Sequence, residues 1–330
     1  MVSNFEFLEK DFPVLANFGE LAEKYCYSDS NSCLMKLGMI GETIVNLMFT
    51  YDRIALPQDN TAVARIDTLV REGLLTRDLA TILHGLRKVR NKAVHENYSS
   101  VTDGKNFLPM AYGMCEWFMQ TYGDWSYIHK DFVMPEESVM AVAIDKTAEE
   151  KKEAELAKQA EENAANAPKV AQEERKKQAY KVANQRPKTE AETRFLIDEQ
   201  LRMVGWEADT ENICYSKGVR PTKGRKLAIA EYPTNSTAGN RGYADYALFI
   251  GERLVGIIEA KAIHKDIPSV IDYQGKDYPR CIREEDERYV IGKWGDFKVP
   301  FTFATNGRPY LEQYKTKSGI WFLDLRKPDN

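Results

Sequence analysis

Two carboxylates and a lysine, Asp245, Glu259 and Lys261, give this 330-residue chain the residue types of a hydrolytic metal site. Carboxylates held close together repel each other, and one pKa rises unless a cation joins them. A hard divalent ion such as Mg²⁺ suits this role, because it prefers carboxylate oxygens and keeps several waters. A lysine beside the ion could hold a water or stabilise an oxyanion. These residues are therefore the first candidates for a catalytic site.

Pairing of two predicted strands would bring the three residues together. Two apolar runs flank a glycine turn, and we expect Ile250 to pair with Leu254 across it. The same register places Asp245 opposite Glu259, with side chains about 5 Å apart. Lys261 joins Glu259 because residues two apart share a strand face. The alternative is a solvated strand end, which is what most acid-x-Lys triplets are, but the buried run before Glu259 favours a site.

The formal net charge of −4 predicts no global basic field that would attract nucleic acid. Locally, residues 217 to 226 carry five basic side chains and no acidic one, and Lys223 and Arg225 are among them. Such a run could contact phosphates. On charge alone, a solvated loop is an equally good interpretation.

The five cysteines form no CxxC pair and no zinc-ligand spacing, and their number is odd. Free thiols in a reducing compartment are the simplest interpretation. The N-terminal residues lack a signal-peptide pattern, and no apolar run looks long enough to span a bilayer. We therefore expect a cytoplasmic protein with no membrane partner.

The chain divides by composition into three parts. Residues 1 to 145 are predicted to form a helical bundle, since apolar residues recur at steps of three and four, as from Asn31 to Tyr51. Residues 146 to 186 are rich in Ala, Glu and Lys with almost no large apolar residues, which predicts a solvated, charged helical linker. Residues 187 to 330 are predicted to form an α/β domain with a central mixed sheet. The expected fold class is thus α plus α/β.

Within the last part, we expect one helix from Thr189 to Val204 and another from about Ser269 to Glu285. The expected strands are Lys226 to Glu231, Tyr243 to Ile250, Leu254 to Lys261, Phe301 to Ala304 and Ile320 to Leu325. The catalytic candidates then lie on the second and third of these strands.

A second candidate site is the segment from Arg90 to His95 in the helical part. An arginine, a polar residue and a histidine at this spacing resemble the catalytic signature of HEPN-type ribonucleases. The resemblance implies that the histidine moves a proton from a ribose hydroxyl while the arginine neutralises the phosphate. Residues five apart lie about 140° from each other on one ideal helix, so catalysis would need dimerisation or a local break. The alternative is that Asn91 and His95 are structural or partner contacts.

The first candidate site also resembles a known family. Asp245, Glu259 and Lys261 match the PD-(D/E)XK nuclease motif, with Ala244 in place of its proline. Further features are an upstream helix with Glu190 and Glu192, a QxxxY pattern at Gln274 and Tyr278, and a strand and loop that end at Arg308. Together they resemble the N-terminal nuclease domain of the R (restriction) subunit of type I restriction-modification enzymes. The helical part resembles the HEPN-like domain that precedes the nuclease in some of these subunits.

This resemblance implies a type I site-specific deoxyribonuclease with Mg²⁺ as its cofactor. Asp245, Glu259 and the Ala260 carbonyl would bind the metal, and Lys261 would orient or help to deprotonate the attacking water. Glu192 could complete the metal shell, with Glu190 as the competing choice on the same helical turn.

The resemblance also implies which residues contact DNA. Gln274 and Tyr278 would position the backbone of double-stranded DNA near the metal. Arg308, Lys223 and Arg225 could contact phosphates, which position a duplex but carry no base identity. The expected protein partners are the specificity and methyltransferase subunits of a restriction-modification complex.

The family's R subunit also carries a helicase-like motor, but this chain has no GxxxxGK[ST] phosphate loop. We therefore expect ATP hydrolysis only through a motor that lies outside this chain. Three hypotheses follow: a DNA endonuclease module, a ribonuclease acting through Arg90 and His95, and a non-catalytic module that docks other subunits.

Overall fold

The computed structural model describes residues 2–137, 146–235, 241–261, 274–305 and 320–327. The chain forms two compact units, Met1–Pro187 and Lys188–Asn330. The first contains only helices among its described residues, and the second contains a six-stranded sheet with helices. This is the predicted fold class, α plus α/β.

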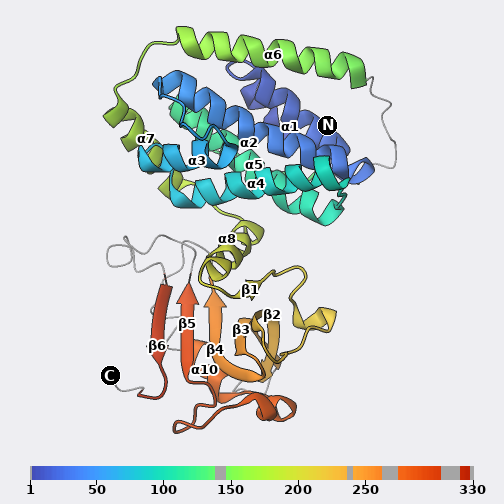
Figure 1. Ribbon diagram of the computed structural model, residues 1–330, viewed down its shortest axis with the longest axis vertical. Coiled ribbons are helices and arrows are strands. Elements are labelled where there is room, and N and C mark those ends of the chain that lie inside the picture. Colours follow the sequence, from blue (N-terminus) through green and yellow to red (C-terminus); the bar gives the residue numbers. More distant parts are fainter. Residues whose placement is uncertain (1, 138–145, 236–240, 262–273, 306–319, 328–330) are drawn as a thin grey trace. The chain divides into compact units, whose positions relative to one another are not determined.

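The first unit is built around α2 (Ser30–Asp52), which packs against five other helices of the unit (Figure 1). Its buried positions recur at steps of three and four residues and include Leu34, Leu37, Ile40 and Ile44, as predicted. The surrounding elements are η1 (Asn4–Leu8), α1 (Pro13–Ser28), α3 (Ala62–Arg71), α4 (Arg77–Glu96) and α5 (Val101–Tyr122).

Among the described residues, one helix, α2, has the length and the apolar composition that would allow it to cross a membrane. This differs from the expectation that no such run exists. In the structure, 67% of the relevant window is buried inside the protein. Burial of this kind is typical of the core helix of a helical bundle.

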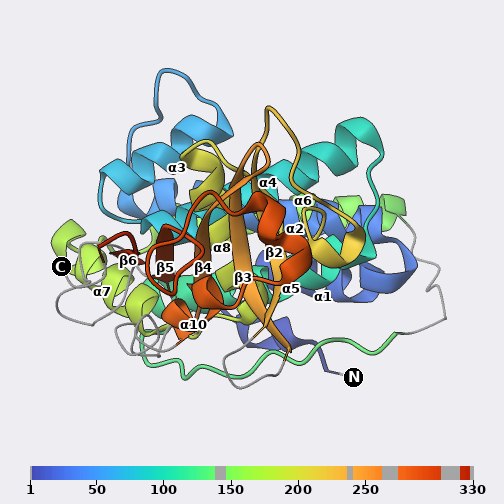
Figure 2. The same ribbon diagram turned by 90° about the horizontal axis from the view of Figure 1, so that it is seen from below.

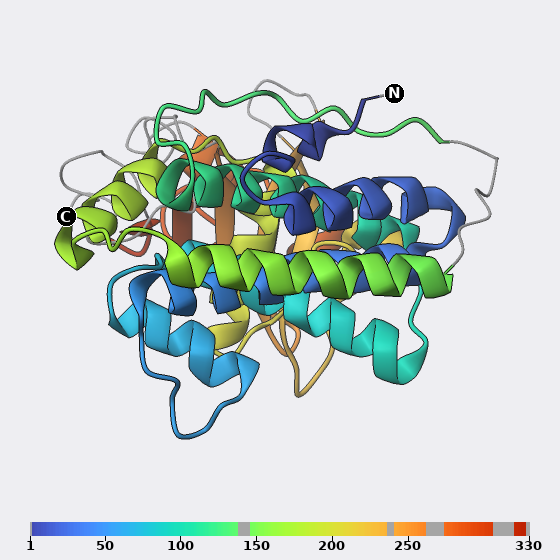
Figure 3. The ribbon, with the colours of Figure 1, turned by 90° about the horizontal axis from the view of Figure 1, so that it is seen from above.

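The charged segment after residue 145 is helical, as expected, but it packs on the first unit. Its first helix, α6 (Lys146–Asn166), lies along α1 and α2 (Figure 3). Lys36 of α2 is buried and forms ion pairs with Glu149, at 2.5 Å, and with Glu153. The apolar contact of α6 comes from alanines, with Ala164 only 2% exposed. A composition without large apolar residues therefore still provides a packing face.

The second helix of this segment, α7 (Gln172–Gln185), packs against α5. The Trp117 indole N–H donates to the Ala179 carbonyl at 3.1 Å. Arg175 is buried beside Asp52, with 3.5 Å between Nε and Oδ1. Both helices thus belong to the compact unit that ends at Pro187.

The second unit contains a mixed sheet with the strand order β1-β2-β3-β4-β5-β6. The β1–β2 and β4–β5 pairs are parallel and the others are antiparallel. The strands are β1 (Glu207–Ala208), β2 (Lys226–Asn235), β3 (Arg241–Ile250), β4 (Arg253–Ala260), β5 (Phe301–Thr305) and β6 (Ile320–Asp324). All five expected strands are present, and only the two-residue β1 was not predicted.

Apolar clusters cover both faces of this sheet. Helix α8 (Glu190–Met203) packs on one face, where Ile197 and Leu201 contact Tyr246 of β3 and Ile258 of β4 in one cluster. The cluster on the other face includes Phe249 and Tyr289, the latter from the 3-10 helix η3 (Glu284–Tyr289).

The helix predicted from about Ser269 to Glu285 ends earlier than expected. Helix α10 spans Gln274–Arg280 and packs beside β4 and β5 (Figure 2). Residues 262–273 lie outside the described part of the chain. Pro279 lies within the last turn of α10, which ends one residue later, because proline removes a helical N–H donor.

Candidate active site

The β3–β4 hairpin sets the register of the candidate carboxylates. At the turn, Ile250 pairs with Arg253, so the predicted Ile250–Leu254 pair is wrong by one residue. A β-bulge next to Leu248 then shifts the register by one. From there the pairing continues to Tyr246 and Ile258, which is the register predicted for the site.

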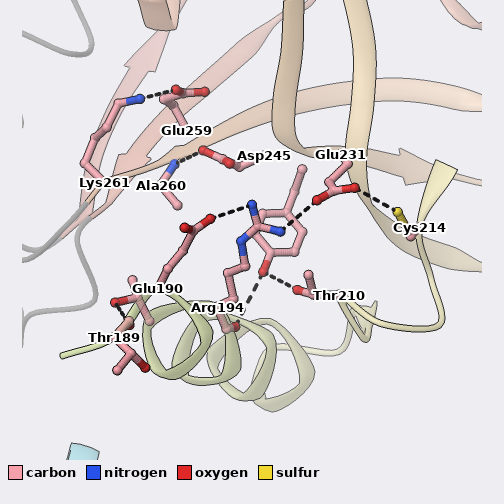
Figure 4. A network of polar contacts seen from close by, with 12 residues as sticks. Thr189, Glu190, Arg194, Thr210, Cys214, Glu231, Asp245, Glu259, Ala260 and Lys261 are labelled. Atoms are coloured by element: carbon pink, nitrogen blue, oxygen red, sulfur yellow. Dashed lines mark hydrogen bonds and ion pairs between the residues drawn. The ribbon is translucent and has the colours of Figure 1, made fainter. Parts of the chain in front are cut away.

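Continuing this register by one residue places Asp245 opposite Glu259. The Ala260 N–H donates to Oδ2 of Asp245 at 2.7 Å, so this carboxylate bonds to the backbone of β4 (Figure 4). The Lys261 ammonium lies 2.5 Å from Oε1 of Glu259. The structure therefore brings the three predicted residues together at the end of β4.

Burial and mutual repulsion perturb both carboxyls. Burial, followed by the negative charge of Asp245, raises the pKa of Glu259 to about 7, although Lys261 partly offsets the rise. Burial also raises the pKa of Asp245, and the Ala260 N–H and nearby cations oppose this. Glu259 is only 3% exposed. Its Oε2 atom is buried and has no hydrogen-bond partner within the described residues.

Helix α8 brings a charged network to this end of the sheet. The Thr189 hydroxyl caps the helix by accepting from the Glu192 N–H at 3.1 Å. Glu190 pairs with Arg194 at 3.0 Å, and the charges of both act on Asp245. The negative charge of Glu190 is among the causes that raise the pKa of Asp245, whereas Glu192 is buried at 1% exposure.

Arg194 also joins the site to β2, and this contact was missed from the sequence. Its guanidinium lies 3.0 Å from Glu231, and the Cys214 thiol donates to the same carboxylate at 3.5 Å (Figure 4). Glu231 has a positive φ of 49°, a left-handed conformation that interrupts the alternation of side chains along β2. The i,i+4 spacing of Glu190 and Arg194 was the available sequence signal for this network.

Of the residues predicted to contact DNA, Tyr278 lies at the site. Burial raises its pKa to about 12, and the next causes are the negative charges of Glu259 and Asp245. Gln274 lies on the same short helix, as expected for the QxxxY pattern. Arg308 lies outside the described residues.

The basic run before β2 lies at the other end of the strands. The Arg225 carbonyl accepts a hydrogen bond from the Gly251 N–H, which lies in the β3–β4 turn. The Arg225 guanidinium forms an ion pair with Glu207 at 2.6 Å. Lys223 is exposed and lies 3.9 Å from Glu252. About five residues of strand, roughly 17 Å, separate this turn from the level of Asp245. The run therefore does not line the carboxylate pair.

The second candidate, Arg90 with His95, lies entirely on α4, which continues without a break from Arg77 to Glu96. Arg90 pairs with Glu42 of α2 at 3.1 Å, whereas His95 is exposed in the last turn. The two side chains thus project about 140° apart, as expected for an unbroken helix. They do not converge within one copy of the chain.

Comparison with known proteins shows that the chain is similar to the endonuclease subunit of a type I restriction enzyme. Residues 207–330 match the family described as the second domain of the type I restriction enzyme EcoKI endonuclease subunit. Nearly the whole chain, 99% of it, aligns with the type I restriction enzyme EcoKI endonuclease subunit of Escherichia coli (strain K12), at 28% identity over 405 positions.

The chain spans 34% of the length of that relative. Residues 20–159 also match a domain of unknown function (DUF4145), whose range extends into α6. No solved structure matches the chain at a significant level.

Proposed function

We propose that residues 188–330 form a Mg²⁺-dependent DNA endonuclease centre, the nuclease part of a type I restriction enzyme R subunit. The observation that carries the proposal is the buried Oε2 atom of Glu259, which lacks a partner within the described residues. The neighbouring Asp245 charge raises the pKa of this carboxyl. A buried carboxylate pair of this kind is stabilised by a divalent cation.

The donor set fits Mg²⁺ better than a transition metal. Among the described residues, no group of three or more His, Cys, Asp and Glu side chains could hold a metal ion. Mg²⁺ is commonly held by one or two carboxylates while it keeps several waters. Asp245 and Glu259 supply the two carboxylates, and the Ala260 carbonyl is the proposed third ligand.

Hydrolysis of a phosphodiester joins a water oxygen to phosphorus and releases the bridging oxygen of the cleaved strand. When bound, Mg²⁺ supplies Lewis acidity at the phosphate and lowers the pKa of a water. Lys261 stands beside Glu259, where its ammonium can orient the attacking water or stabilise charge on a phosphate oxygen. Tyr278 is half-buried near both carboxylates, where its side chain can position the DNA backbone.

The partners follow from the same proposal. Double-stranded DNA is the substrate, and specificity and methyltransferase subunits complete the restriction complex. ATP hydrolysis by a helicase-like motor would deliver the DNA to the site. The similarity to a type I restriction enzyme endonuclease subunit supports this proposal at the level of a restriction nuclease.

Binding of Mg²⁺ tests the proposed centre directly. We expect Asp245→Asn to remove measurable Mg²⁺ binding in titration calorimetry at pH 8, because one of two carboxylate ligands is lost. Asp296→Asn is the matched control, since this acid is exposed and lies in the turn between Trp294 and Phe297 rather than at the carboxylate pair. Equal Mg²⁺ affinity in Asp245→Asn and the wild type would contradict the proposal.

Arg194 is expected to weaken the attraction of the site for cations. Its charge lowers the pKa of Asp245 and also pairs with Glu190. Arg194→Gln should therefore raise the pKa of Asp245 and increase Mg²⁺ affinity about threefold to tenfold at pH 8. Arg225→Gln, an ion-paired arginine at the other end of the strands, should leave the affinity unchanged. A decrease in Arg194→Gln would show that positioning outweighs charge.

A further inference from the structure

The helical unit contains a cavity of about 540 Å³ between α2, the start of α3, and α4. Three arginines line it, Arg65 from α3 and Arg87 and Arg90 from α4. One acid, Glu42, lies on its wall and pairs with Arg90 at 3.1 Å. This volume lies within the range of pockets that bind small molecules.

Two of the three guanidinium charges have no carboxylate partner in the described part of the chain. Arg65 donates to amide oxygens instead, from Nε to Asn60 at 2.8 Å and from Nη1 to Asn46 at 2.5 Å. The Nε atom of Arg87 is buried and has no hydrogen-bond partner within the described residues. Leaving a buried guanidinium N–H without an acceptor costs free energy, which a bound anion would recover.

The backbone geometry holds the arginines at the cavity. A Cβ at Gly38 of α2 would lie 2.2 Å from Cβ of Arg90, so glycine is required for α4 to approach this closely. Arg65 is fixed by the two amides that it contacts. The first residues of α3, Ala62 and Val63, also line the cavity, and helix N-termini favour negative charge.

We propose that this cavity binds the phosphate group of a phosphorylated small molecule. A phosphate dianion matches the two unneutralised guanidinium charges, and arginine binds phosphate oxygens through paired N–H donors. The side-chain amides of Asn46, Asn60 and Asn91 on the wall offer donors and acceptors to the rest of the ligand. Binding relies on Arg65 and Arg87 and does not involve His95, which does not line the cavity, so it is separate from ribonuclease chemistry and from the nuclease centre.

The full chain can be titrated calorimetrically with inorganic phosphate, adenosine 5′-monophosphate and adenosine. We expect both phosphate-bearing probes to bind and adenosine not to bind. Tighter binding of the monophosphate identifies an organic phosphate as the ligand, whereas equal affinity identifies free phosphate. No binding of either phosphate probe in the millimolar range would overturn the proposal.

Variants locate the site. The Arg65→Gln and Arg87→Gln double variant should bind phosphate at least about tenfold more weakly, because charged hydrogen bonds are lost. Arg87→Gln alone should fold normally, since no salt bridge of this side chain is found among the described residues and its Nε atom has no hydrogen-bond partner there, and it should still weaken binding. Arg77→Gln, exposed on the same helix and away from the cavity, is the control. Unchanged affinity in Arg87→Gln would overturn the assignment.

Discussion

Glu259→Gln is expected to reduce DNA cleavage by about 10³-fold or more, because it removes a carboxylate ligand from the proposed metal centre. Metal ions contribute several kcal/mol to the stabilisation of such transition states, and each 1.36 kcal/mol corresponds to a factor of ten in rate. The substitution keeps the size of the side chain and an oxygen that can accept from Lys261. Loss of DNA cleavage in this variant would therefore result from loss of the Glu259 charge rather than from a packing defect.

The measurement is nicking of supercoiled DNA by the reconstituted restriction complex with ATP and Mg²⁺. The whole complex is needed, because the proposed motor delivers the DNA. Asp296→Asn should cleave as the wild type does. A Glu259→Gln complex with wild-type cleavage would remove the endonuclease proposal. If His95→Ala instead abolished RNA cleavage by the chain, the ribonuclease hypothesis would replace it.

The strands of the second unit could be predicted because their apolar runs are bounded by turn residues. The pairing of Asp245 with Glu259 was predicted from an incorrect turn. Ile250 pairs with Arg253, and a bulge beside Leu248 compensates for this single-residue error. No residue type in β4 announces that bulge, because it depends on how the two strands twist against each other.

The helices of residues 146–186 could be predicted, but their packing could not. Large apolar residues are the usual signal of a buried face, and α6 buries alanines and paired charges instead. Lys36 looks like a surface residue in the sequence, yet it is buried between two glutamates of α6. Such ion pairs become apparent only when both helices are placed.

The charged network at the site was only partly predictable. The upstream acids Glu190 and Glu192 were identified from the resemblance, and which of them completes the metal shell stays a prediction. Arg194 was missed because its second partner, Glu231, faces α8 only through a left-handed backbone conformation. Left-handed residues other than glycine are rare, and glutamate carries no signal for them.

The pH dependence of Mg²⁺ binding is the second large effect. Protons and Mg²⁺ compete for Glu259, whose pKa is raised to about 7. Mg²⁺ affinity should therefore be nearly constant above pH 7 and should fall by about tenfold per pH unit below it, or roughly 100-fold between pH 7 and pH 5. Asp245, whose pKa is also raised, would steepen the fall at the lower end. Calorimetric affinities between pH 5 and pH 8.5 test this, and a flat profile would contradict it.

Without metal, the free energy of unfolding should fall as pH rises, whereas Mg²⁺ affinity rises with pH. The folded state holds a proton on Glu259 between the ordinary pKa of 4.5 and about 7, where the unfolded chain does not. Stability from this group is therefore fully present below pH 4.5 and is lost as pH rises through 7. Glu259→Gln removes this titration, so it should match the wild type at pH 4.5 and exceed its stability by about 3 kcal/mol at pH 8. Thermal unfolding of both proteins in chelator, compared across pH, would reveal the difference. A variant less stable than the wild type at pH 8 would show that the buried carboxylate is already satisfied without metal.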